Sequence, residues 1–171
     1  MVKKLILGLG VFATLLFGAK LEDAKSAYEK GDYKTSFTIL EELASKGDAE
    51  AQYNLGVMYS NGQGVKQDYK KAKEWYEKSA TQGFAKAQYN LGVMYSNGKG
   101  VKQDYKKAKE LYEKAASQGD ADAQNNLGVM YVNGYGAKQD YKKAKEYFGK
   151  ACDGGNQVGC NNYKILNQQG Y

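Results

Sequence analysis

The side chains that most often carry chemistry in proteins are scarce in this chain. Its 171 residues include no His and no Arg, and the two cysteines stand at positions 152 and 160. Histidine is the commonest general base and the commonest metal ligand, and two cysteines alone cannot complete a four-ligand zinc site. The composition therefore argues against metal-dependent hydrolysis and histidine-based nucleophilic catalysis. We expect no cofactor and no bound metal.

One pair of residues has the spacing of a known nucleophile motif. Ser96 and Lys99 fit Ser-x-x-Lys, in which a lysine one helical turn beyond a serine lowers the proton affinity of the serine. The same place holds Ser60 with Gln63 in one sister segment, and Val132 with Tyr135 in another. Because the pair occurs once, on a glycine-containing turn, coincidence is the favoured interpretation, and no catalytic residue is assigned.

The sister segments arise because the sequence repeats with a period of 36 residues. Residues 51–86 match residues 87–122 at 30 of 36 positions, and residues 87–122 match residues 123–158 at 23 of 36. A period of this length is typical of stacked helix pairs, each packed only on its neighbours. The predicted fold is therefore all-α, a right-handed α/α solenoid of helix pairs.

Each repeat carries two apolar stripes with helical spacing. In the first copy they are Ala51, Leu55, Met58 and Tyr59, and then Tyr69, Ala72, Trp75, Tyr76 and Ala80. We expect Asp68 to cap the second helix, Gly83 to end it, and Gly56 to allow close approach of the two helices. The expected pairs span 48–60 with 68–82, 84–97 with 104–118, and 120–133 with 140–153.

The segments at the two ends differ from the repeats. Residues 20–47 are predicted to form a degenerate helix pair, residues 48–155 the three repeats, and residues 156–171 a C-terminal capping helix. Residues 1–19 have the pattern of a signal peptide, with Lys3 and Lys4 followed by a short apolar run. Its removal would leave 23 Lys and 19 acidic residues, a net charge of +4. We expect a secreted or periplasmic monomer, which meets a membrane only if the signal stays uncleaved.

The repeat unit resembles a known family. The pattern Ala-x-x-x-Leu-Gly-x-Met-Tyr-x-Asn-Gly-x-Gly, followed by Asp-Tyr-x-x-Ala-x-x-x-Tyr-x-x-Ala, is similar to the Sel-1-like repeat, a relative of the tetratricopeptide repeat. The signal and the cysteines resemble the secreted cysteine-rich bacterial branch of this family. That resemblance implies a β-lactamase or penicillin-binding hydrolase as the alternative function. The branch repeats its Cys-x7-Cys pair in every unit, whereas this chain has it once.

The two cysteines are placed for a disulfide. Cys152 aligns with Ala116 at the end of a second helix, and Cys160 aligns with Gln124 near the start of the following first helix. Adjacent antiparallel helices bring such positions within bonding range, and an even number of cysteines behind a signal peptide supports a bond. Two reduced, buried thiols are the alternative.

A polar and aromatic stripe on the first helices is the candidate binding face. Its members recur at 36-residue intervals: Tyr53, Asn54, Val57; Tyr89, Asn90, Val93; Asn125, Asn126, Val129. The resemblance to tetratricopeptide arrays implies that this face lines a concave groove, where Asn54 aligns with an asparagine that holds peptide backbone. The alternative is that the asparagines only bond neighbouring repeats. The copies are nearly the same, so each is expected to contribute similarly to binding.

The leading hypothesis for function is a scaffold that binds a protein or peptide partner through this face. The lysines of the second helices, among them Lys66, Lys70, Lys71 and Lys73, alternate with acids and are expected to be a solvated outer surface. A net charge of +4 and the lack of arginine, which binds phosphate with a two-pronged fork, argue against nucleic acid as a partner.

Overall fold

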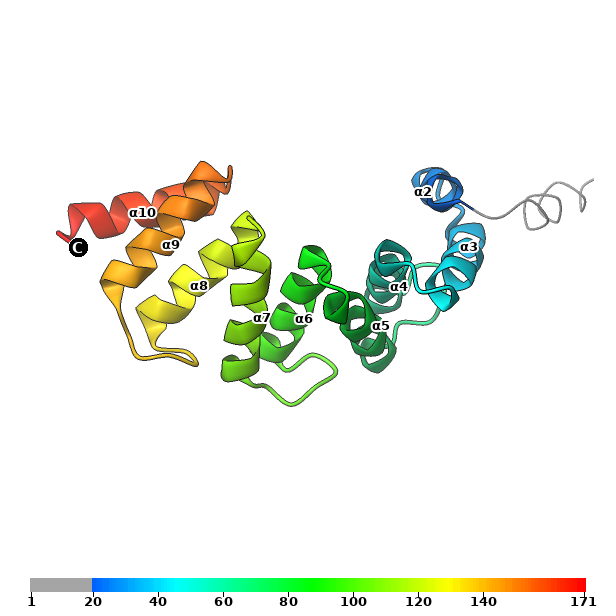
Figure 1. Ribbon diagram of the computed structural model, residues 1–171, viewed down its shortest axis with the longest axis horizontal. Coiled ribbons are helices and arrows are strands. Elements are labelled where there is room, and N and C mark those ends of the chain that lie inside the picture. The colour runs from blue at the N-terminus through cyan, green and yellow to red at the C-terminus, as the bar shows by residue number, and fades with distance from the viewer. Residues whose placement is uncertain (1–19) are drawn as a thin grey trace, which may run out of the picture.

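The computed structural model describes residues 20–171, so the predicted signal peptide at 1–19 lies outside the described residues. All regular secondary structure in these residues is α-helical. Its helices are α2 (Leu21–Glu29), α3 (Tyr33–Ser45), α4 (Ala49–Asn61), α5 (Tyr69–Thr81), α6 (Ala85–Asn97), α7 (Tyr105–Ser117), α8 (Ala121–Asn133), α9 (Tyr141–Asp153) and α10 (Gln157–Gln168). They follow one another in an arc, with α2 and α10 at its two ends (Figure 1). The predicted all-α solenoid of helix pairs is confirmed.

The helix boundaries come from capping residues that recur in every repeat. Asp68 accepts hydrogen bonds from the backbone N–H groups of Lys70 and Lys71, so α5 begins where the sequence predicted. At the other end of each first helix a glycine such as Gly62 adopts a left-handed conformation, with φ of 71°. Between α2 and α3 three residues suffice for the turn, because the Gly-rich loop of the later repeats is missing there.

The core lies between the helices of each pair and between neighbouring pairs. Leu55 and Met58 of α4 are fully buried, and Tyr76 of α5 is 3% exposed. A Cβ atom on Gly56 would lie 2.5 Å from the ring of Tyr76, so only glycine permits this approach of α4 and α5. Gly92 against Tyr112 and Gly128 against Phe148 repeat the contact. The predicted packing role of Gly56 is thereby confirmed.

The Gly-rich loops join each repeat to the one before it. Gly100 has a φ of 69°, and a Cβ atom there would lie 2.7 Å from the Cβ atom of Tyr69, which begins the preceding second helix. One repeat later, the ring of Tyr135 stacks on that of Tyr105 with centroids 4.6 Å apart. Loop and helix therefore form part of the interface between repeats.

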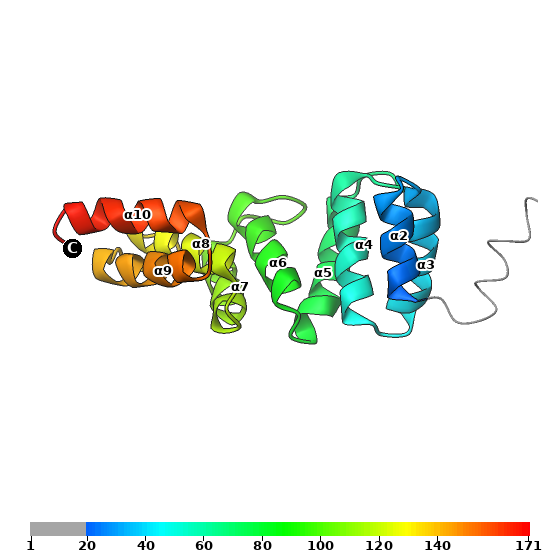
Figure 2. The same cartoon turned by 90° about the horizontal axis from the view of Figure 1, so that it is seen from above.

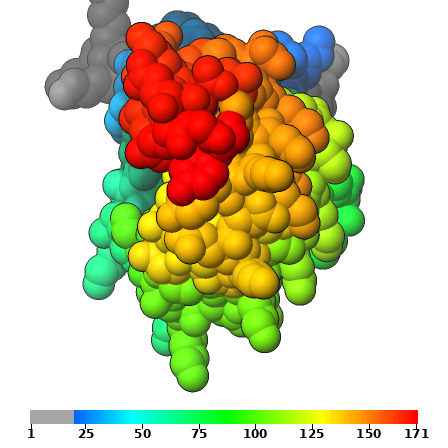
Figure 3. Space-filling view, turned by 90° about the vertical axis from the view of Figure 1, so that its left-hand side faces the viewer, coloured from blue at the N-terminus to red at the C-terminus, as the bar shows by residue number. Residues whose placement is uncertain are grey.

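The end of the array is formed by α10, which packs on α9 and touches α8. Seen from above, the array runs from α2 and α3 to α10 without folding back on itself (Figure 2). In the end-on view the C-terminal residues, in red, lie beside the orange residues of α9 (Figure 3). The capping role of α10 stays a prediction. Within residues 20–171, no helix has the length and apolar character needed to cross a membrane.

Candidate functional site

The disulfide predicted from the sequence is present. Cys152, in the last turn of α9, is bonded to Cys160 in the first turn of α10, and their Cα atoms are 4.4 Å apart. The bond closes the turn between two antiparallel helices, as the alignment of the two positions indicated.

The disulfide stands in place of a hydrogen bond that ties the other repeats together. Gln88 of α6 donates its side-chain amide to the carbonyl oxygen of Ala80 at 3.2 Å, and Gln124 of α8 does the same to Ala116. Both bonds span eight residues, from the start of a first helix to the end of the preceding second helix. Cys160 occupies the glutamine position and Cys152 the alanine position of this pattern. Sequence reasoning aligned these residues but did not recognise the role of the glutamines.

In the first two repeats, the side-chain oxygen of the glutamine at this position, Gln52 or Gln88, also accepts a hydrogen bond. Gln82 donates to Oε1 of Gln52 at 2.8 Å, and Gln118 donates to Oε1 of Gln88 at 2.8 Å. Gly154 stands where the third donor would be. Within residues 20–171, Oε1 of Gln124 is therefore buried without a hydrogen-bond donor. A Cβ atom on Gly154 would lie 2.8 Å from that of Ala121, which shows why a larger residue does not fit.

The nine candidate residues of the binding stripe lie on α4, α6 and α8 and are half-buried. We call them the first-helix surface: Tyr53, Asn54, Val57, Tyr89, Asn90, Val93, Asn125, Asn126 and Val129. Its aromatic members pack onto the second helices. The ring of Tyr53 is 6.0 Å from that of Tyr76 and 5.3 Å from that of Phe84, and Tyr89 is 5.9 Å from Tyr112.

One asparagine of this surface donates a hydrogen bond to the preceding repeat. The side-chain amide of Asn90 donates to the hydroxyl of Tyr76 at 3.4 Å. Burial raises the pKa of Tyr112 to about 12, and the nearby side chain of Asn126 opposes that rise. The alternative raised for the asparagines, bonding between repeats, therefore describes Asn90, and Asn126 lies beside the equivalent tyrosine.

Asn54 has different surroundings. It lines a cavity of about 240 Å³ between α2, α3 and α4, together with Tyr53 and Val57. Leu40 of α3 stands where Tyr76 and Tyr112 stand in the later repeats, so no hydroxyl faces Asn54 from that position. The three asparagines, equivalent in the sequence, are therefore unequal in the structure.

The Ser-x-x-Lys pair is not arranged as in a serine hydrolase. Ser96 is in the last turn of α6, where its side chain lies near the buried hydroxyl of Tyr112. Lys99 follows the helix, and its ammonium lies over the ring of Tyr69, 5.9 Å from the centroid. The helix ends between the two residues, at Gly98, whose φ is 68°. The lysine is thus not one helical turn beyond the serine, as activation of the serine requires.

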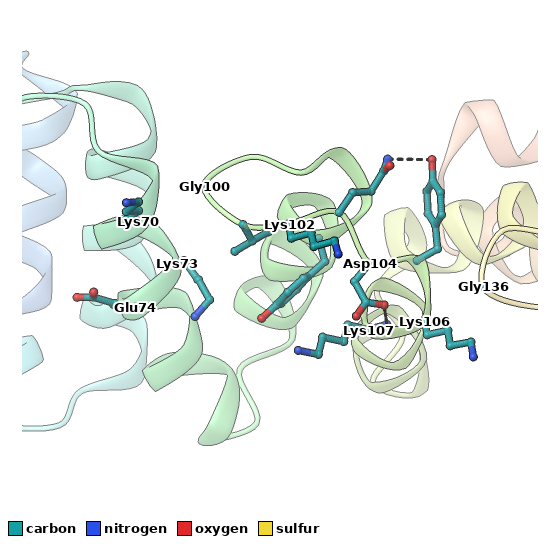
Figure 4. Close-up of a pocket in the computed structure, with 13 residues that line it drawn as sticks. Lys70, Lys73, Glu74, Gly100, Lys102, Asp104, Lys106, Lys107 and Gly136 are labelled. Carbon is teal, nitrogen blue, oxygen red and sulfur yellow. Dashed lines mark hydrogen bonds between the residues drawn. The ribbon is translucent and has the colours of Figure 1, made fainter.

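The lysines of the second helices line a larger hollow of about 890 Å³ beside the loop that precedes α7 (Figure 4). Lys73 pairs with Glu77 at 2.7 Å, and the ammonium of Lys107 lies 5.2 Å from the ring centroid of Tyr95. Gln103 donates to the hydroxyl of Tyr105 at 2.9 Å, the bond drawn in Figure 4. The ion pair with Glu77 balances the charge of Lys73. Within residues 20–171, no three His, Cys, Asp or Glu side chains are grouped to hold a metal.

Comparison with solved structures identifies related arrays. A Sel1 repeat protein from Oxalobacter formigenes is 32% identical, with a TM-score of 0.84 over 89% of this chain and 62% of that one. The protective antigen c5321 of uropathogenic Escherichia coli, which has an SLR fold, is 34% identical, with a TM-score of 0.79 over 88% of this chain and 37% of that one. This chain thus spans less than two thirds of the length of either relative.

A shorter relative aligns with this chain over almost the whole of the relative's own length. Helicobacter pylori cysteine rich protein B is 27% identical, with a TM-score of 0.57 over 84% of this chain and 97% of that one. No curated protein matches the chain. The sequence model of the Sel1 repeat matches residues 49–84, 85–120 and 121–156, which together are more than half of the chain. The chain therefore belongs to the Sel1 repeat family.

Proposed function

We propose that this protein is a scaffold outside the cytoplasm that binds an extended segment of a partner protein on its first-helix surface. The observation that carries the proposal is the recurrence of half-buried amide and aliphatic side chains on three successive first helices, with a tyrosine beside them on the first two. Tyrosine offers a large amphipathic contact area, and asparagine both donates and accepts hydrogen bonds, so the two together suit a peptide backbone with its side chains.

Three features support a place outside the cytoplasm. A disulfide persists in oxidising compartments and is rare where glutathione keeps thiols reduced. The predicted signal peptide at residues 1–19 gives the route of export. A cysteine-rich protein is among the structural relatives. Secretion into the medium and retention in the periplasm are both compatible with these features.

The test uses two matched substitutions. One places a carboxylate on a first helix, and the other places a carboxylate on a second helix. Val93 lies on the first-helix surface, and Leu111 is an equally half-buried apolar residue on the second helix α7. We expect Val93→Asp to reduce the recovery of partner proteins from the cell envelope, and Leu111→Asp to leave it unchanged, after circular dichroism has shown that both variants are folded. Equal recovery by the wild-type chain and the Val93 variant would contradict the proposal.

A further inference from the structure

The cavity beside Asn54 distinguishes the N-terminal end of the first-helix surface from the rest of it. We propose that this cavity is the principal peptide subsite: it takes one apolar side chain of an extended peptide, while the amide of Asn54 bonds the peptide backbone next to that side chain. The inference rests on the proposed function, since it names one subsite of the same surface.

The walls of the cavity fit an apolar side chain. Its floor contains Ala24, Leu40 and Met58, which are 1%, 3% and 1% exposed. Tyr53 and Val57 contribute further apolar surface from α4. A volume of about 240 Å³ accommodates one large aliphatic side chain. Because binding gains free energy from the apolar surface that it removes from water, this contact would be the largest single apolar contribution to peptide binding on the surface.

The amide of Asn54 is an uncharged polar group in the lining of the cavity. In the next repeat, Asn90 donates to the hydroxyl of Tyr76. Leucine has no hydroxyl, so Leu40 offers Asn54 no such acceptor, and within residues 20–171 the side chain of Asn54 makes no hydrogen bond. Its amide therefore keeps one acceptor and two donors, the set that pairs with both the N–H and the C=O of a peptide unit.

The same substitution explains why the cavity exists at this repeat. In the next repeat the ring of Tyr76 is 3% exposed and packs beside Tyr53, so the tyrosine fills the space between the helices and bonds the asparagine at once. Leu40 is shorter and leaves that space open. Open space and an unused amide thus share one cause, a leucine at a tyrosine position.

The charges at the rim do not select a charged ligand. Lys25 lines the cavity, but its ammonium is 2.8 Å from the carboxylate of Glu50, and this pairing raises the pKa of the lysine. Glu29 adds one exposed carboxylate to the lining. One paired cation and one anion favour neither a positively nor a negatively charged ligand. We therefore expect the apolar side chain of the peptide to determine binding.

The experiment is an NMR titration of ¹⁵N-labelled protein, used in the form recovered from an exporting host. The probe is the capped peptide acetyl-Ser-Gly-Leu-Gly-Ser-amide, and its control has serine in place of leucine. We expect the leucine peptide to shift the side-chain amide signals of Asn54 and to leave those of Asn90 and Asn126 in place. The serine peptide should shift none of the three.

Three variants make the test specific. Asn54→Ala should weaken binding about three- to tenfold, the effect of one or two hydrogen bonds, with an unchanged melting temperature. Glu110→Ala, at an exposed position of α7 outside the first-helix surface, should leave both the melting temperature and the affinity unchanged. Leu40→Tyr should fill the cavity and abolish binding, which provides a second answer if the Asn54 variant does not fold.

The outcomes separate this subsite from the proposed function. Shifts confined to Asn90, Val93 or Asn126 would overturn the subsite and leave a binding surface in place. The absence of any shift up to about 10 mM leucine peptide, a concentration that detects even millimolar affinity, would also overturn it. Recovery of partners that is insensitive to Val93→Asp would instead refute the proposed function, whatever the peptide does.

Discussion

Cys160 occupies the position that Gln124 holds one repeat earlier, and each side chain joins the start of a first helix to the residue eight positions before it. In the repeats this link is a hydrogen bond from glutamine to a helix-end carbonyl, and at the end of the array it is covalent. The disulfide also brings α10 close to α9: a Cβ atom on Gly159 would lie 2.7 Å from that of Ala151. Glycine there replaces the alanine found in the other repeats.

Reduction of this disulfide should destabilise the protein. A loop as short as that between Cys152 and Cys160 contributes roughly 2–3 kcal/mol in the chain-entropy model. Urea unfolding with and without reductant measures the difference. The double variant Cys152→Ala, Cys160→Gln restores the glutamine link and should be more stable than Cys152→Ala, Cys160→Ala. Titration of two free thiols in the exported protein would contradict the assignment.

The buried glutamines should differ in their contribution to stability. Gln88 donates to Ala80 and accepts from Gln118, whereas Gln124 donates to Ala116 and has no donor to its buried oxygen within residues 20–171. Replacement of Gln88 by Met should therefore lower the free energy of unfolding by about 1 kcal/mol more than Gln124→Met, because it removes one further hydrogen bond. Urea denaturation of the two variants checks this, and equal losses would show that the second bond contributes nothing.

Stability should fall in alkaline solution because of two tyrosines. Burial raises the pKa of Tyr76 and Tyr112 to about 12 in the folded protein, against 10 in the unfolded chain. Between these values the unfolded chain loses protons that the folded protein retains, so the free energy of unfolding decreases as the pH rises from 10 to 12. The decrease is about 2–3 kcal/mol for each tyrosine.

Phenylalanine at these positions provides the control for the alkaline effect. Phe148 already stands at the third equivalent position and is 2% exposed, so the site accommodates a ring without a hydroxyl. The double variant Tyr76→Phe, Tyr112→Phe should lose stability less steeply above pH 10 than the wild-type protein, as measured by urea unfolding at successive pH values. Parallel curves for the two proteins would contradict the burial of these hydroxyls.

The sequence predicted the array because its period and its caps are local signals. Asp68, Gly83 and the apolar stripes gave helix boundaries within two residues of those in the structure. The inequality of the asparagines could not be predicted in this way, because it depends on which residue of another helix faces each amide. Comparison of Leu40 with Tyr76 in the alignment was the available signal, and it has meaning only once the contact between Tyr76 and Asn90 is known.

The serine–lysine pair leads to a prediction on the hydrolase alternative. With the end of α6 between Ser96 and Lys99, and with Lys99 placed over Tyr69, the lysine is not positioned to activate the serine. We expect no multiple turnover of nitrocefin by protein from a host that lacks β-lactamases. Turnover that is lost in Ser96→Ala would show that the pair assembles in solution, and turnover that survives this change would place a nucleophile elsewhere.

The most direct test of a binding scaffold is site-specific photo-crosslinking in the cell that makes the protein. A benzophenone amino acid replaces Val57 on the first-helix surface in one variant and exposed Glu110 on α7 in the other. The account predicts that the probe at position 57 crosslinks to a defined segment of a partner protein and that the probe at position 110 does not. Crosslinking of the same segment at equal yield from both positions, or from position 110 alone, would contradict it.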